Sequence, residues 1–400
     1  MEAAVTLNAR TVWLICWTSS CWAFSFGLGS QVVSHWLKAQ GANDTVIGLN
    51  HSFYYFGLAV AACAVPGLTR RLGPSRCAAL GMTFAGITLA LFPWAGSDMG
   101  CYLLRFLNGC AGALSLVPLE TIISSDSPAD RKTQNFAFYG VALTLGGALG
   151  IGIGLNLYQP GDTLAFYLGG SAPILAGLVL HCQLNRPQQL LPDTTRVPLH
   201  LGRNFLSYGT AWCQGFLEGG MLAFLSLFLL SRGFSESVAG TLMSITMVGV
   251  IAFQVPVSWL ADRYGKTPML LGCYAVVALG LVAVPWLSNS IWLAVVLFAF
   301  GACTGAMYPL GLSLLGDRVP AHGLARAYAW YLAIECIGSQ VGAAAMGKAR
   351  DAWGETAMFS IGLAAVLAVL AMWLCLRLLQ PERMLTAELE GKTECPRQAA

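Results

Sequence analysis

Four ionisable side chains lie inside long apolar stretches of this 400-residue chain: Arg105, Glu120, Glu218 and Glu335. A charged side chain at the centre of a bilayer costs about 2.5–3.5 kcal/mol on insertion scales, so each should be paired or functional. Glu218 and Glu335 fall about halfway along their stretches. A carboxylate in apolar surroundings keeps its proton to a higher pH than in water, so it can bind and release protons near neutral pH. Both glutamates are therefore candidates for proton transfer.

The stretches around these residues define the class of protein. Hydrophobic residues make up 56% of the chain and charged residues 10%, against roughly 25% charged in soluble domains. A spanning helix needs about 20 apolar residues. Glycines inside the stretches and the absence of strand-like alternation favour a helical bundle over a barrel. We expect an all-α membrane protein with twelve transmembrane helices, near residues 12–37, 45–68, 77–95, 100–124, 134–157, 163–183, 204–230, 238–260, 268–287, 291–315, 324–347 and 355–378.

Lysine and arginine indicate the orientation. They concentrate in the loops on the side of the N-terminus, and only Lys38, Arg232, Lys348 and Arg350 fall on the other side. The positive-inside rule then predicts that both termini are cytoplasmic, in a cell membrane that we expect to be a bacterial inner membrane. The net charge of +3 therefore reflects topology and does not indicate nucleic-acid binding.

An internal repeat organises the chain. Seven glycine pairs lie 192 residues apart: Gly27 and Gly219, Gly41 and Gly233, Gly48 and Gly240, Gly57 and Gly249, Gly109 and Gly301, Gly146 and Gly338, Gly150 and Gly342. We interpret this as a duplication. It predicts an N-terminal six-helix half (1–183), a cytoplasmic linker (184–203), a C-terminal six-helix half (204–379) and a disordered cytoplasmic tail (380–400).

A short loop also occurs twice at this spacing. Residues 259–266 read Trp-Leu-Ala-Asp-Arg-Tyr-Gly-Lys, and residues 67–74 read Gly-Leu-Thr-Arg-Arg-Leu-Gly-Pro. With the pattern Arg105-x-x-x-Gly109-x-x-Gly112, these loops resemble the major facilitator superfamily, whose loop signature is approximately G-x-L-x-D-R-x-G-R-K. The first copy departs from it, since Arg70 stands where the family has aspartate. The resemblance covers residues from about 10 to 380 and implies two six-helix halves around a central cavity, lined by the first, fourth, seventh and tenth helices.

The doubled loop predicts a gate at the cytoplasmic ends of the helices. Asp262 can cap a facing helix, and Arg263 can reach an acid such as Asp317. Gly265 permits the tight turn. The other predicted gating residues are Arg71, Gly73 and Glu120.

The repeat singles out the two glutamates. Glu218 is equivalent to Phe26 and Glu335 to Leu143, so both carboxylates are additions that the symmetric scaffold did not require. Glu218 should face the cavity, with Gln214 on the same helical face one turn away, although a structural role in holding a neighbouring helix is the alternative. Glu335 either faces the cavity or pairs with another helix, because Gly338 and Gly342 on its stripe suit close packing.

The remaining candidates have weaker signals. Arg105 could hold a carboxylate of a substrate or of another helix, and Glu120, about 22 Å away along the same helix, could pair with Arg131 or Lys132 near the cytoplasm. Aromatic side chains could stack an amphipathic solute, although packing roles are commoner. Those predicted to line the cavity are Trp22, Phe26, Tyr54 and Tyr331.

These features predict a secondary transporter that moves a small amphipathic organic solute by alternating access, coupled to protons and acting as a monomer. Export is slightly favoured over uptake, although the Gly-Pro pair typical of the fifth helix in family antiporters is absent from residues 140–154. A non-transporting sensor or assembly factor is the alternative of another class. No nucleotide-binding loop is present, and the 13 cysteines lack metal-site spacing, so we expect no cofactor and no enzymatic activity.

Overall fold

The computed structural model describes residues 8–127, 132–184, 202 and 204–319, and 324–379. Most of the predicted linker and the whole predicted tail therefore lie outside the described residues. Within them the chain is helical and contains no strand. The α-helices are α1 (Ala9–Ala39), α2 (Asp44–Leu72), α3 (Pro74–Ala90), α4 (Asp98–Asp126), α5 (Lys132–Leu157), α6 (Leu164–Gln183), α7 (Phe205–Ser231), α8 (Glu236–Tyr264), α9 (Lys266–Ala283), α10 (Ser290–Gly316), α11 (Leu324–Trp353) and α12 (Ala357–Leu379), with short 3-10 turns η1 (Phe92–Trp94) and η2 (Val284–Trp286).

Local sequence signals set equivalent helix ends in the two halves. Asn43 caps α2 by accepting a hydrogen bond from the Val46 amide at 2.9 Å, and Ser235, 192 residues later, caps α8. Both helices end at a glycine with positive φ, 84° at Gly73 and 95° at Gly265. Glycine adopts this conformation without steric cost, so both signature loops make the same sharp turn into the next helix.

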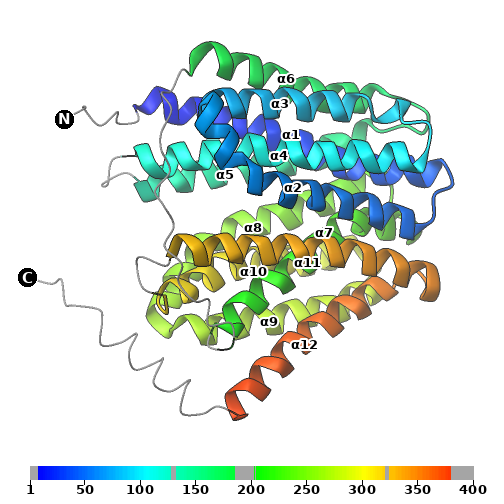
Figure 1. The fold of residues 1–400 in the computed structure, drawn as a ribbon. Coiled ribbons are helices and arrows are strands. Elements are labelled where there is room, and N and C mark those ends of the chain that lie inside the picture. The colour runs from blue at the N-terminus through cyan, green and yellow to red at the C-terminus, as the bar shows by residue number, and fades with distance from the viewer. Residues whose placement is uncertain (1–7, 128–131, 185–201, 203, 320–323, 380–400) are drawn as a thin grey trace, which may run out of the picture.

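The helices form two bundles that lie side by side (Figure 1). We call α1–α6 the N-terminal half and α7–α12 the C-terminal half. The halves meet mainly where α2 packs on α11 and where α5 packs on α8. Helix α1 begins and α12 ends at the same end of the molecule, which we call the termini end. The opposite end carries the α1–α2 and α11–α12 turns.

Close helix crossings repeat at the 192-residue spacing and explain five of the seven glycine pairs. A methyl group at Gly57 would overlap the carbonyl oxygen of Phe106, and one at Gly249 would overlap that of Phe298. Four further glycine pairs have the same kind of contact with the backbone carbonyl of equivalent residues. Gly109 contacts Tyr54 and Gly301 contacts Thr246; Gly146 contacts Ser20 and Gly338 contacts Trp212; Gly150 contacts Phe24 and Gly342 contacts Phe216; Gly27 contacts Gly147 and Gly219 contacts Ser339. The absence of a side chain lets helix backbones touch at the same places in both halves.

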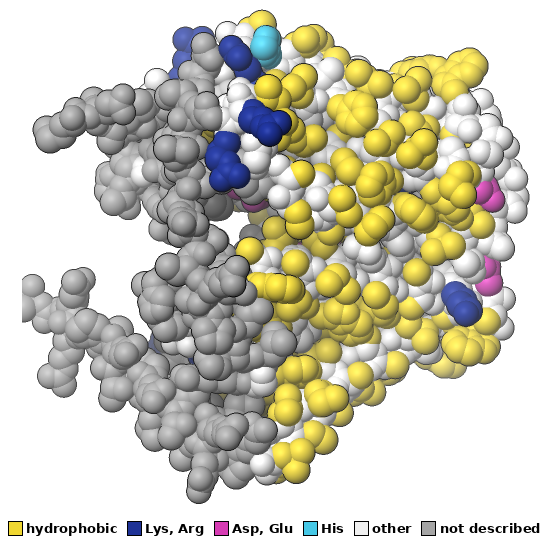
Figure 2. Space-filling model, in the orientation of Figure 1, with side chains coloured by type: hydrophobic (Ala, Val, Ile, Leu, Met, Phe, Trp, Pro, Cys, Tyr) yellow, Lys and Arg dark blue, Asp and Glu magenta, His cyan; other side chains and the backbone are white. Residues whose placement is uncertain are grey.

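The surface suits a bilayer. Figure 2 shows hydrophobic side chains over the middle of the visible face, with lysine and arginine gathered toward the termini end. Among the described residues, ten helices are long and apolar enough to cross a membrane. The helices outside that set are α3, which has 17 residues, and α11, which carries polar and charged side chains along its length, Glu335 among them. The prediction of an all-α membrane protein is thus confirmed in its coarse form.

Candidate functional site

A cavity of about 390 Å³ lies between the two halves. Small-molecule sites commonly measure about 300–1,000 Å³. Helices α1, α2, α4 and α5 supply one wall, and α7, α8, α10 and α11 supply the other. The lining includes Trp22, Phe26, Tyr54, Tyr55, Leu143, Thr144, Gln214, Glu218, Met221, Met243, Thr246, Met247, Thr304, Glu335, Cys336 and Ser339.

The wall of the N-terminal half is aromatic. The rings of Trp22 and Phe26, one helical turn apart on α1, stack with centroids 5.5 Å apart. Phe26 then contacts Tyr54 of α2 at 5.1 Å, and Tyr55 lies edge-on to Tyr54 at 5.3 Å. The hydroxyls of both tyrosines are buried, and neither makes a hydrogen bond to a described residue.

The wall of the C-terminal half carries both predicted carboxylates. Gln214 Nε2 donates to Glu218 Oε2 at 2.8 Å across one turn of α7. Glu335 lies on α11, which packs close to α7 because Gly215 sits directly on the Glu335 backbone carbonyl. The two carboxylates lie within electrostatic range of each other. Glu335 lines the cavity while Gly338 and Gly342 of the same helix contact α7, so both features of the predicted stripe are present.

The two walls are built from equivalent positions. Gln214 and Glu218 correspond by the repeat to Trp22 and Phe26, and all four line the cavity. Glu335 and its equivalent Leu143 also line it. At each of these three equivalent positions, the N-terminal half therefore presents an aromatic or aliphatic side chain and the C-terminal half a polar or acidic one.

Two residues predicted to line the cavity lie elsewhere. Arg105 is 2% exposed, and its Nε donates to Asn50 Oδ1 at 3.1 Å. Its guanidinium lies 5.4 Å from the centre of the Tyr54 ring, so it packs against the aromatic wall without lining the cavity. Tyr331 is fully buried, and its hydroxyl donates to the Tyr308 carbonyl at 3.0 Å. Packing and a backbone acceptor account for Tyr331 without any ligand.

Glu120 is held by an aromatic hydroxyl of the neighbouring helix. Tyr139 Oη donates to Glu120 Oε1 at 3.3 Å, which joins α5 to α4. Of the predicted partners, Arg131 and the side chain of Lys132 lie outside the described residues. Glu120 also interacts electrostatically with Glu335, which lines the cavity.

The signature loop of the C-terminal half forms an ion pair, but not the predicted one. Lys266 Nζ contacts Asp317 Oδ2 at 2.6 Å, whereas the Arg263 guanidinium lies over the adjacent Tyr264 ring at 5.7 Å. The reason is that α9 starts at Lys266 directly after the Gly265 turn, so the ammonium reaches the end of α10, where the Ser313 carbonyl also lies 3.4 Å away. The side chain of Asp262 lies outside the described residues. Arg71, in the equivalent loop, is exposed.

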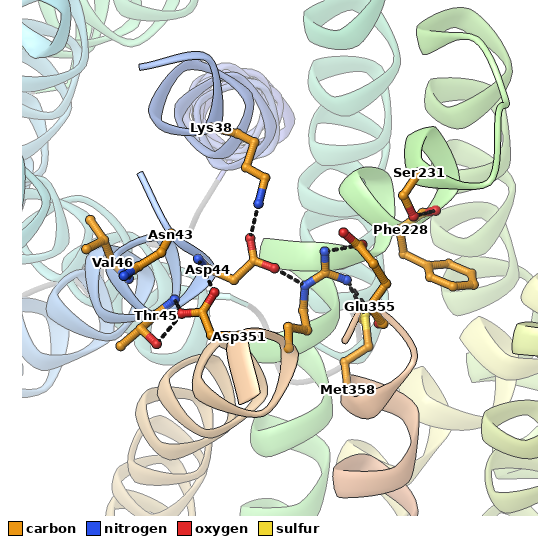
Figure 3. A network of polar contacts seen from close by, with 11 residues as sticks. Lys38, Asn43, Asp44, Thr45, Val46, Phe228, Ser231, Asp351, Glu355 and Met358 are labelled. Atoms are coloured by element: carbon orange, nitrogen blue, oxygen red, sulfur yellow. Dashed lines mark hydrogen bonds and ion pairs between the residues drawn. The ribbon is translucent and has the colours of Figure 1, made fainter. Parts of the chain in front are cut away.

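A polar network at the end opposite the termini was not predicted (Figure 3). We call it the latch: Lys38, Asp44, Thr45, Arg350, Asp351 and Glu355. Asp44 accepts from Lys38 Nζ at 2.7 Å and from Arg350 Nε at 2.8 Å, so its carboxylate joins the two halves. Arg350 also pairs with Glu355.

The second acid of the latch caps a helix of the other half. Asp351 accepts hydrogen bonds from the backbone amides of Asp44 at 2.9 Å and Thr45 at 2.7 Å, and from the Thr45 hydroxyl at 2.5 Å. A carboxylate at a helix N-terminus satisfies free amides and complements the helix dipole. Asp351 of α11 thereby ties down the start of α2 in the N-terminal half.

The repeat contained a signal for the latch. Asp44 and Arg350 correspond to Glu236 and Tyr158, so the α2–α11 contact has an arginine where the α5–α8 contact has a tyrosine. Between these helices one bond is symmetric: Ser52 Oγ donates to the Gln340 carbonyl at 2.7 Å, and its equivalent Ser244 donates to the Ala148 carbonyl at 3.2 Å. Arg350 is therefore a departure from the repeat, like Glu218, whereas its partner Asp44 has an acidic equivalent in Glu236.

Comparisons with known proteins agree with this architecture. An uncharacterized MFS-type transporter of Bacillus subtilis, YfkF, is 24% identical over 377 residues, covering 91% of this chain and 94% of the relative. One from Methanocaldococcus jannaschii is 20% identical over 367 residues, covering 88% and 93%.

Solved structures share the fold. The nucleoside transporter NupG has a TM-score of 0.76 at 14% identity, covering 91% of this chain and 98% of that one. A D-xylose-proton symporter has a TM-score of 0.73 at 15% identity, covering 90% and 97%. A family model described as Major Facilitator Superfamily matches residues 15–228 and 205–397. The chain is therefore a member of the Major Facilitator Superfamily, a family of membrane transporters and not of enzymes.

Proposed function

We propose that this protein is a proton-coupled secondary transporter that moves a small amphipathic organic solute by alternating access through the cavity between its halves. In this proposal α3 and α11 also span the membrane, giving twelve spans. The termini end faces the cytoplasm, the membrane is a bacterial inner membrane, and the working unit is a monomer. The concentration of lysine and arginine at the termini end supports this orientation.

The observation that carries the coupling proposal is the presence of Glu218 and Glu335 in the cavity wall. Both carboxylates lie in the middle of the bundle, and no lysine, arginine or histidine lines the cavity within the described part of the chain. Gln214 donates a hydrogen bond to Glu218, which holds the carboxylate in place without neutralising it. A carboxylate that is exposed to a water-filled cavity and lacks a cationic partner can exchange a proton with either side of the membrane as the halves rock.

The energy of the gradient is sufficient for such a cycle. Moving one charge across a membrane potential of 100 mV releases about 2.3 kcal/mol, which corresponds to more than a tenfold concentration ratio, since about 1.4 kcal/mol is a factor of ten. One titrating glutamate per cycle is thus enough for uphill transport.

The conformation supports a rocking cycle. Among the residues that the structure describes, the polar contacts between the halves gather toward the latch end: Gln31 Nε2 donates to the Leu222 carbonyl at 2.8 Å, and His35 and Ser226 lie 3.0 Å apart. Beyond them lies the latch. We assign this conformation to the state that is closed on the side opposite the cytoplasm.

Export is slightly favoured over uptake. A cavity acid that is free to bind either a proton or a solute allows exchange of one for the other, which is the chemistry of an exporter driven by inward proton flow. Uptake by proton symport is the alternative, and it needs proton and solute to bind together. A non-transporting membrane sensor is the alternative of another class, and it would leave both carboxylates dispensable.

The test is transport by the purified protein in liposomes under an imposed pH gradient, with a panel of small organic solutes. We expect Glu218→Gln to lose gradient-driven accumulation, because the glutamine side chain cannot bind and release a proton near neutral pH. The matched control is Glu236→Gln, because Glu236 lies at the far end of α8 and does not line the cavity. Unchanged gradient-driven transport in Glu218→Gln would remove Glu218 from the coupling step. Absence of transport of any solute by the wild type would favour the sensor.

A further inference from the structure

We propose that the solute is an amphipathic organic cation, such as an aryl-substituted amine, with its charged nitrogen on the Glu218–Glu335 side and its ring on the Trp22–Phe26–Tyr54 side. This inference rests on the proposal that the cavity is the transport site, and it adds the charge class of the solute. It is drawn from the lining itself: its charge, its free hydrogen-bonding atoms and the division between its two walls.

The formal charge of the described lining is entirely negative. Glu218 and Glu335 line the cavity, and Glu120 lies within electrostatic range of Glu335. The Arg105 guanidinium packs against the Tyr54 ring and is not part of the lining. The other titratable side chains that line the cavity, Tyr54, Tyr55 and Cys336, supply no positive charge. An anionic solute would therefore meet like charge, and a neutral one would leave two desolvated carboxylates without a counter-charge.

Among the described residues of the acidic wall, the buried side-chain oxygen or nitrogen atom that lacks a hydrogen bond is an acceptor. Gln214 uses its Nε2 on Glu218, which leaves Gln214 Oε1 buried and without a hydrogen bond to any described residue. No described side chain donates to the Glu335 carboxylate; the Ser339 hydroxyl donates to its backbone carbonyl instead, at 3.2 Å. The Gln214 amide oxygen and a carboxylate oxygen are groups that accept from an ammonium N–H.

The opposite wall suits the rest of such a molecule. Trp22, Phe26 and Tyr54 form a continuous aromatic surface, which can stack a ring or attract a cation through its π face. Because the aromatic and acidic positions are repeat equivalents, Phe26 matches Glu218 across the pseudo-symmetric cavity. A ligand with a cationic end and an aromatic end complements both walls at once.

The experiment compares solutes that share a benzyl group and differ in the charge of the group attached to it. Equilibrium binding to the protein in lipid nanodiscs is measured for N,N-dimethylbenzylammonium, which carries one ammonium N–H, for its neutral carbon isostere isobutylbenzene and for the anion phenylacetate, with partition into empty nanodiscs subtracted. We expect the cation to bind at least about tenfold more tightly than the isostere, and the anion to bind most weakly. Equal or tighter binding of the isostere or the anion to the wild type overturns the proposal without requiring any variant.

Variants assign the preference to the carboxylates. Glu218→Gln and Glu335→Gln should each reduce the ratio of cation to isostere affinity, and the double variant should bring it near one while the affinity for the isostere stays within about twofold. Glu236→Gln should leave the ratio unchanged. Binding of the isostere also verifies that each variant is folded. A cation preference that survives in the double variant contradicts the assignment.

The result separates this inference from the proposed coupling. If the cation preference holds but a pH gradient drives no transport in liposomes, the coupling fails and the solute class stands. If gradient-driven transport is observed with neutral or anionic solutes and the wild type shows no cation preference, the transporter proposal stands and the solute class is wrong.

Discussion

At the scale of single residues, the ring and the hydroxyl of Tyr54 should contribute very differently to the stability of the protein. Its ring contacts Phe26 and Tyr55 and carries the Arg105 guanidinium on its face. Its hydroxyl is buried without a hydrogen bond to a described residue. The ring should therefore supply nearly all of its contribution to stability.

Tyr54→Phe should change the free energy of unfolding by less than about 1 kcal/mol, because it removes a hydroxyl that makes no hydrogen bond to any described residue. Tyr54→Ala should cost about 3–5 kcal/mol, as for other large aromatic truncations in a core, and it should also expose Arg105 to the cavity. Thermal unfolding of the purified protein in detergent checks both. A Tyr54→Phe variant as unstable as Tyr54→Ala would show that the hydroxyl has a partner, such as a bound water.

Several residues of the cavity wall could be predicted from the sequence. Glu218, Gln214, Trp22 and Phe26 were predicted to line the cavity, and all four lie in its wall. The sequence left open whether Glu335 faces the cavity or pairs with another helix. The depth of each side chain in the bundle follows from its place along the apolar stretch, which can be read from the sequence.

Arg105 and Tyr331 were misplaced because a helical position does not determine the direction of a long side chain. Asn50 and the Tyr54 ring give Arg105 partners on α2, and the Tyr308 carbonyl does the same for Tyr331. These partners become neighbours only through tertiary packing. The Lys266–Asp317 pair was missed for a similar reason, since the Gly265 turn determines which cation reaches α10.

At the scale of helices, the paired glycines make a prediction about packing. Gly338 of α11 lies against the Trp212 carbonyl of α7, at a site where a methyl group would overlap the backbone. Gly272 of α9 has open space around its Cα. Both are inside helices, so the intrinsic helix preference of alanine over glycine, about 1 kcal/mol, is the same for each.

Gly338→Ala should therefore destabilise the protein by about 1–3 kcal/mol, the usual cost of overpacking, because α7 and α11 must move apart. Gly272→Ala should be neutral or slightly stabilising. The measurement is the midpoint of thermal unfolding for the two variants side by side. Equal midpoints would mean that the α7–α11 crossing can relax without cost. Because α7 and α11 carry Glu218 and Glu335, Gly338→Ala should also weaken ligand binding.

Helix positions were the most predictable level of the fold. Apolar stretches located the helices, and Asn43, Ser235, Gly73 and Gly265 set ends that match their local chemistry. The sequence could not indicate which helices of one half would touch the other, because these helices become neighbours only through tertiary packing. That information lies in specific contacts such as Ser52 with the Gln340 carbonyl.

At the scale of the whole molecule, the halves are pseudo-symmetric in backbone and asymmetric in charge. The cavity has an acidic wall on one half, and the α2–α11 contact has the latch while the α5–α8 contact has Tyr158 and Glu236 in the equivalent places. A symmetric scaffold can rock between two states; asymmetric side chains determine which state is held and what is bound. The latch should therefore control the balance between the two states.

Asp351→Asn tests this with an isosteric change. Burial acts to raise the pKa of Asp351, but the Thr45 hydroxyl and amide, the Asp44 amide and the charge of Lys38 together lower it below its ordinary value. An acid with a lowered pKa in the closed state stabilises that state at all pH values above its ordinary pKa, near 3.9, and loses the effect only as pH falls through the lowered value. Closure by the latch should thus be constant between pH 5 and 8, and Asp351→Asn should weaken it throughout.

The measurement is the distance between spin labels on Ala42→Cys and Trp353→Cys, in a background whose native cysteines are replaced and whose unfolding temperature is unchanged. Hydrogen bonds to a charged group contribute about 1.5–3 kcal/mol, and the exposure of Asp351 reduces this, so we expect roughly a tenfold shift toward the longer distance. The matched control is Lys348→Gln, which removes a neighbouring exposed charge of α11 outside the latch. If Asp351→Asn and the control give the same distances, the latch does not hold the halves together. If closure of the wild type loosens between pH 8 and pH 5, Asp351 is not the group that sets it.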